Sequence, residues 1–148
     1  MDLTAIASAV AARFTASAIS PPSGYTDPGT AVYKLPTAIT TTPTAVVFPP
    51  EGAFSYAAFK RSGNLTFPVR WYISDAADLP RATAEMYAWA GTLLDQLASP
   101  FDLDLAPPVT HAFIDGVRFG KLEYADHEYT GIELSVIVHT EEAFSPTT

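Results

Sequence analysis

The side chains of this sequence that are best suited to chemistry are three histidines and two closely spaced aspartates. His111, His127 and His139 lie far apart in the chain and match no zinc-binding spacing such as H-E-x-x-H. Asp102 and Asp104 offer carboxylates for a divalent cation, but their segment lacks the glycine and the closing glutamate of a calcium loop. We therefore expect the histidines to be structural and the aspartates to belong to a polar connector.

Short catalytic motifs are also absent from the sequence. It contains no G-x-S-x-G, no Walker loop and no G-x-G-x-x-G. Cysteine is absent as well, which excludes disulfides and thiolate metal sites. We predict no catalytic residue, no metal site and no cofactor, and therefore a protein that is not an enzyme. Because catalytic groups can converge from distant positions, a small α+β enzyme or ligand-binding domain stays open as an alternative.

Length and composition are those of one globular domain over residues 1–148. Hydrophobic residues make up 48% and aromatic residues 12% of the chain. The formal net charge of −8 makes tight binding to nucleic-acid phosphates or to anionic lipid improbable. The N-terminus, MDLTAIASAVAARF, lacks the basic region of a signal peptide, and no run of 18 apolar residues predicts a membrane span.

Two segments have the spacing of amphipathic helices. The first is capped by Asp2 or Thr4 and is expected to end near Ala18. The second is capped by Asp75 or Asp78 and is expected to end at Ser99–Pro100. The predicted buried stripe of the second helix consists of Leu79, Ala82, Met86, Ala90, Leu93 and Leu97.

The middle of the chain predicts β-strands. Ala31–Leu35 and Thr44–Phe48 are flanked by prolines, which predicts edge strands or extended loops. Gly52–Lys60 is predicted as a strand that a turn at Arg61–Asn64 joins to the strand Asn64–Ser74. In this last strand Leu65, Phe67, Val69, Trp71 and Ile73 occupy alternate positions, which is the period of a strand with one buried face.

The C-terminal third predicts further strands. Val109–Ile114 and Val117–Tyr124 flank Asp115–Gly116, a typical hairpin turn. Ile132–Val138 forms the last predicted strand, and residues 141–148 are predicted to be a flexible tail. The order of elements predicts an α+β fold, a mainly antiparallel β-sheet with two α-helices packed on one face.

Pro68 stands in the middle of the best-patterned strand. Proline cannot donate a hydrogen bond to a ladder, so Pro68 predicts either a sheet edge or a bulge. A nitrogen that faces away from the ladder explains the residue equally well.

The turn that precedes this strand carries Lys60 and Arg61, the only adjacent basic pair of the sequence. The aromatic residues Phe54, Tyr56 and Phe59 surround it. We predict that this hairpin tip projects from the sheet and contacts another chain. Solvated charges and aromatic residues packed in the core or along an edge are the alternative.

The element order and three local sequences resemble the tail terminator (tail-completion) proteins of long-tailed bacteriophages. The sequences are TAITTTPTAVVFPP, TFPVRWYIS before the long helix, and HEYTGIELSVIVHT in the last strand, and the resemblance runs from Leu3 to Thr140. It implies a ring, usually a hexamer, at the head-proximal end of the tail tube. Such a ring stops tube polymerisation and presents a surface to the head–tail connector. The resemblance implies no cofactor and no catalytic residue.

Several expectations follow from the resemblance. The protein would be part of the virion, assembled in the host cytoplasm, with itself, the tail tube protein and the connector protein as partners. Phe54, Tyr56, Phe59, Lys60, Arg61 and Pro68 become the candidate subunit or tube interface. DNA would pass through an acidic lumen without specific binding. A head–tail connector or adaptor of the same neck region remains the nearest alternative.

Overall fold

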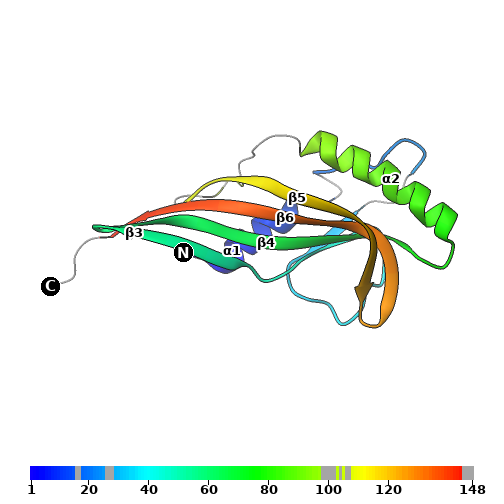
Figure 1. The fold of residues 1–148 in the computed structure, drawn as a ribbon, viewed down its shortest axis with the longest axis horizontal. Coiled ribbons are helices and arrows are strands. Elements are labelled where there is room, and N and C mark those ends of the chain that lie inside the picture. The colour runs from blue at the N-terminus through cyan, green and yellow to red at the C-terminus, as the bar shows by residue number, and fades with distance from the viewer. Residues whose placement is uncertain (16–17, 26–28, 98–102, 104, 106–107, 145–148) are drawn as a thin grey trace.

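In a computed structural model of the chain, residues 1–15, 18–25, 29–97, 103, 105 and 108–144 are described. They form two helices and a six-stranded sheet (Figure 1). The elements in chain order are α1 Leu3–Ala12, β1 Thr30–Val32, β2 Thr44–Val47, β3 Glu51–Ala57, β4 Lys60–Asp75, α2 Leu79–Gln96, β5 Val109–Tyr124 and β6 His127–Ala143.

The sheet is organised around the long strands β4 and β6, in the order β1-β2-β4-β6-β5. One side of β4 pairs with β6. On the other side, β3 pairs with the first half of β4 and β2 pairs with the second half of β4. Among the described strand pairs, β1–β2 is parallel and the others are antiparallel. The result is the predicted α+β fold with a mainly antiparallel sheet.

Both helices pack on the same face of the sheet, which explains the alternation in β4. The odd-numbered apolar residues of β4, from Leu65 to Ile73, are buried in one core with residues of α1 and α2. At its centre the ring of Trp71 contacts those of Phe14 and Trp89, with ring centroids 5.7 and 5.6 Å apart. The predicted buried face of this strand is therefore confirmed.

The two helices begin where their capping residues predict. The Asp2 carboxylate accepts a hydrogen bond from the Ala5 N–H in α1, and Asp78 accepts one from the Arg81 N–H in α2. α1 ends at Ala12, earlier than expected. The predicted stripe of α2 is correct except for its first residue, Leu79, which is exposed, and it omitted the buried Trp89.

Three predicted turns or ends are wrong. β3 and β4 are joined at Ala58–Phe59, and residues 61–64 belong to β4. Asp115–Gly116 is a bulge inside the continuous strand β5, because pairing to β6 overrides the local turn signal. Glu141–Ala143 are part of β6 and not of a flexible tail.

The edge-strand prediction is also wrong for β2. Its four residues are buried between β1 and β4, because the flanking Pro43 and Pro49 lie outside the paired segment. The opposite sheet face has a smaller apolar cluster around Tyr72, whose ring contacts those of Tyr124 and Tyr129. Within the described ranges, neither helix combines the length and apolarity needed to cross a membrane.

Candidate subunit interface

An arm of paired strands extends from the sheet beyond the helices (Figure 1); β5 pairs with residues 137–140 at its base, and its outer part is three-stranded. The arm consists of β3, residues 60–66 of β4 and residues 137–144 at the end of β6. In Figure 1 its tip lies at the end of the molecule opposite α2. The Phe144 N–H donates to the Phe59 carbonyl at 2.6 Å, so the last described residue is tied to the tip. The β3–β4 hairpin therefore projects from the body of the fold (Figure 1), although its turn lies at Ala58–Phe59 and not at residues 61–64.

The two faces of the arm differ sharply in chemistry. Residues directly opposite each other on paired strands point to the same face. Phe54 lies opposite Gly63, and Tyr56 lies opposite Arg61, which in turn lies opposite Glu142. This face, which we call the aromatic face, continues the helix-bearing side of the sheet, because Phe54 packs against the main core. The other face presents small and polar residues, among them Ser55, Ser62, Asn64 and Glu141.

Arg61 is the centre of the aromatic face. Its guanidinium carbon lies 5.1 Å from the ring centroid of Phe54 and 5.4 Å from that of Phe144. Its Nη2 donates to Glu142 Oε1 at 2.5 Å. This hydrogen bond to Glu142, with a second one to Tyr56, raises the pKa of Arg61 further above its ordinary value. The arginine therefore holds the two aromatic rings and the carboxylate in one arrangement.

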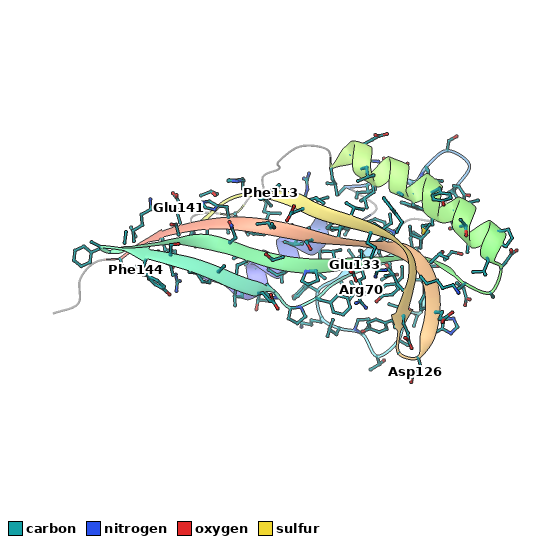
Figure 2. All side chains as sticks on the ribbon, viewed as in Figure 1. Arg70, Phe113, Asp126, Glu133, Glu141 and Phe144 are labelled. Atoms are coloured by element: carbon teal, nitrogen blue, oxygen red, sulfur yellow. The ribbon has the colours of Figure 1, made fainter. Side chains whose placement is uncertain are left out.

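The basic pair at the tip is neutralised by acidic neighbours. Lys60 Nζ lies 3.7 Å from Glu141 Oε1, and Arg61 pairs with Glu142. Figure 2 shows Glu141 and Phe144 at the arm end of the sheet. The two basic residues of the tip thus each have an acidic partner, the Lys60–Glu141 pair being half exposed, and these four charges sum to zero.

Large aromatic side chains are nevertheless exposed there. Tyr56 is 73% exposed, Phe59 60% and Phe144 45%. A groove of about 340 Å³ continues the aromatic face towards the start of α1, lined by Met1, Leu3, Pro50, Gly52, Phe54, Arg61 and Leu65. A contiguous exposed apolar surface of this kind is typical of a protein contact.

Pro68 lies apart from the other predicted interface residues. It faces Ser135 of β6 on one side, while its carbonyl accepts a hydrogen bond from the Phe48 N–H at 2.8 Å on the other. In an antiparallel strand the nitrogen and the carbonyl of one residue point the same way. The nitrogen of Pro68 therefore faces residues 48–50, where β2 has ended and β3 has not begun. Pro68 marks neither an exposed edge of the sheet nor a bulge in the β4–β6 pairing.

Sequence reasoning missed the contribution of the C-terminus to this surface. Phe144, Glu141 and Glu142 were assigned to a flexible tail, yet they complete the arm. The adjacent acids Glu141 and Glu142 mirror the basic pair Lys60 and Arg61. That complementarity was the available signal for pairing the two segments.

A second candidate site surrounds His127 at the other end of the sheet. Its Nε2 lies 2.7 Å from Asp75 Oδ2, beside an open cavity of about 430 Å³. The cavity is lined by residues 38–42, Tyr124, Ala125 and Tyr129 as well as by the pair itself. The hydrogen bond to His127 lowers the pKa of Asp75, and the Ala77 N–H adds to the effect. The pair orients an imidazole, but nothing in the cavity's lining is a cysteine or serine nucleophile.

The other two histidines meet across the β5–β6 pair. The rings of His111 and His139 stack with centroids 5.3 Å apart, and His139 Nδ1 lies 2.9 Å from Asn64 Oδ1. Across the described ranges, no group of three or more His, Asp or Glu side chains is arranged to hold a metal ion. The aspartates at 102 and 104 lie outside the described residues.

No protein-family model matches the chain, and no curated protein matches it. A proposal of function for the chain therefore rests on its residues, its geometry and the sequence resemblance described above.

Proposed function

We propose that the chain is a structural virion protein, a tail terminator. Copies of it form a ring at the head-proximal end of a phage tail tube, end tube polymerisation and provide the joint to the head connector. The observation that carries this proposal is the arm, a projection of paired strands with an exposed aromatic face. The sequence resemblance supplies the class of assembly, usually a hexamer.

The arm is suited to protein contact. Exposed aromatic rings such as Tyr56 and Phe59 contribute large apolar area at interfaces. Arg61 holds Phe54 and Phe144 in place before any partner binds, which lowers the entropy lost on association. A contact between two different patches of the same chain closes into a ring when its rotation permits.

The distribution of charge supports an acidic ring. Glu123 and Glu128 face each other across the β5–β6 hairpin, with Asp126 in its turn; we call these three residues the acidic tip. Figure 2 shows Asp126 at the end of that hairpin. Repeated around a ring whose subunits each have a charge of −8, such tips repel phosphates, so that DNA slides through without adhering.

Two other functions compete with this one. A head–tail connector of the same neck region shares the ring and differs by its position in the particle. A ligand-binding domain is favoured by one observation, the 430 Å³ cavity beside His127 and Asp75.

Electron microscopy of tails with a gold-labelled antibody against the chain tests the proposal. Label at the head-proximal end of isolated tails supports a terminator, and label that stays with the heads supports a connector. A protein that is absent from both, and monomeric in light scattering at every salt concentration, is the result that favours the ligand-binding domain.

A further inference from the structure

The outer edge of β3 has no strand partner in the described part of the chain, because β3 pairs with β4 alone. The two residues that close the β3–β4 turn, Ala57 and Lys60, exchange backbone hydrogen bonds with each other. Successive residues of an antiparallel strand point their N–H and C=O groups to opposite sides. Gly52, Phe54 and Tyr56 therefore direct these groups away from β4, to the free edge.

This edge lacks the features that usually keep edge strands from pairing with other chains. Such features are charged side chains, prolines and bulges. Residues 52–59 include no charged residue and no proline, and the register of β3 with β4 is regular. Charges of opposite sign mark the two ends of the edge: Glu51 begins β3, and Lys60 lies opposite its last residue. An antiparallel second copy brings each Glu51 towards the other chain's Lys60, whereas a parallel copy brings like charges together.

One antiparallel register satisfies the whole free edge of two copies of β3. It is centred on Phe54, which lies opposite Phe54 of the second copy, while Gly52 lies opposite Tyr56. Every outward N–H and C=O group of these three residues then has a partner. A shift of the register in one direction brings Pro50, which has no N–H, into the ladder, and a shift in the other brings in the turn. The boundaries of β3 therefore select a symmetric pairing.

The same register places an exposed aromatic ring at a groove. Tyr56 is 73% exposed and belongs to the aromatic face. Gly52 and Phe54 line the groove of about 340 Å³ on that face, as do Met1 and Leu3. Because Tyr56 of one copy lies opposite Gly52 of the other, its ring covers the glycine and enters this groove. The two-fold axis repeats the contact, so both exposed rings are covered.

We infer that two copies of the chain pair through their β3 edges and extend the sheet across a two-fold axis. The contact is isologous and ends at two copies, so no β3 edge is left for further strand addition. It goes beyond the proposed function, because it does not build the ring. It covers the aromatic face, so the arms of a pair must separate before that face contacts another partner.

Disulfide trapping tests the register, because the chain has no cysteine of its own. In the inferred pair Ala53 lies opposite Ser55 of the second copy, with Cα atoms about 4.5 Å apart, which a disulfide can span. The variants Ala53→Cys and Ser55→Cys, both at exposed positions, are purified separately and mixed in a glutathione redox buffer. Mass spectrometry distinguishes the mixed dimer from the two homodimers. The matched control mixes Ser55→Cys with Ala57→Cys, which lies on the same face but out of register.

We expect the dimer of Ala53→Cys with Ser55→Cys to exceed both homodimers, and the control mixture to give background alone. In sedimentation velocity, Tyr56→Ser is expected to raise the Kd of the pair roughly tenfold, because the ring that enters the groove is lost. Equal amounts of all disulfides, or a wild type that stays monomeric at every protein concentration, would overturn the pairing. Gold label at tail ends would then still support the tail terminator, so the two proposals fail separately.

Discussion

Phe59 is held in a conformation that a bulky residue rarely adopts. It is the second residue of the β3–β4 turn and has a φ of +59°, in the left-handed region that glycine and asparagine tolerate best. Its side chain is 60% exposed, so packing within the molecule does not repay the strain. A strained, exposed aromatic residue at the end of the arm points to a role in contact with a partner.

Replacing Phe59 is expected to have opposite effects on the stability of the folded chain and on its self-association. We expect Phe59→Asn to raise the free energy of unfolding by about 1 kcal/mol, because asparagine is less strained at this φ. The same variant is expected to weaken self-association, because the arm loses an aromatic ring. Thermal melts and light scattering measure the two effects. A lower melting temperature would show instead that the ring stabilises the monomer.

Glu133 is a carboxylate whose contribution to stability depends on pH. It accepts a hydrogen bond from Arg70 Nε at 2.7 Å and lies 3.5 Å from Arg118 Nε, and Figure 2 shows Arg70 and Glu133 together near the middle of the sheet. Burial acts to raise the pKa of Glu133, but the hydrogen bonds from both arginines outweigh it, so the pKa is below its ordinary value. The ionised form is therefore favoured in the folded state.

A carboxyl whose pKa is lowered in the folded state stabilises the fold at pH values above its pKa in the unfolded chain, which is about 4.3 for glutamate. This contribution is lost as the pH falls through the pKa of the folded state. We expect Glu133→Gln to melt below the wild type at pH 7 and to approach it as the pH falls below about 4. Glu51→Gln, at an exposed position of β3, is the control. A Glu133→Gln difference that stays constant with pH would contradict the expectation.

At the scale of elements, periodicity was informative and local turn signals were not. The alternation in β4 and the spacing in α2 predicted the buried faces, because both follow from which side of the element meets the core. The turns were missed because in the true ones, Ala58–Phe59 and Ala125–Asp126, positive φ falls on Phe59 and Ala125, which rarely adopt it, as well as on Asp126. Asp115–Gly116 is a stronger local turn signal, yet the β5–β6 ladder passes through it as a bulge.

The candidate interface could be predicted only in part for a related reason. Phe54, Tyr56, Phe59, Lys60 and Arg61 are close in sequence, and the structure gathers them on the arm. The remaining contributors, Glu142 and Phe144, come from the far end of the chain, and a single sequence does not show which strands pair.

The ion pair between Arg61 and Glu142 gives a test of the arm as a unit. We expect Arg61→Glu to lower the melting temperature and to impair assembly, because two carboxylates then face each other between Phe54 and Phe144. The swapped variant Arg61→Glu/Glu142→Arg is expected to recover part of both losses. The readouts are thermal melts and light scattering. Equal stability of Arg61→Glu and the wild type would indicate that the pair is solvated and unimportant.

At the scale of the whole molecule, charge opposes assembly. A ring gathers subunits with a formal charge of −8 each, and salt screens this repulsion because the Debye length falls from about 10 Å at 0.1 M to about 3 Å at 1 M. We therefore expect light scattering to show a shift from monomers towards rings as salt or protein concentration rises.

Neutralising the acidic tip tests whether its charges cause the expected salt dependence of ring formation. Glu123→Gln, Asp126→Asn and Glu128→Gln together remove three negative charges, among them two that face each other across the hairpin. The triple variant is expected to form rings at lower salt than the wild type. If the two proteins show the same salt dependence, the repulsion arises elsewhere on the surface.

The continuity of β4 and β6 has a mechanical consequence. Both strands run without interruption from the arm, through the core beneath the helices, to the end of the sheet that contacts α2. A force applied to the arm along the strands is therefore carried by the covalent backbones of both β4 and β6, and the hydrogen bonds between them keep the two strands aligned. A neighbour pulling on the arm would thus draw the whole sheet and α2 with it, so tension would pass from subunit to subunit with little bending at the joints.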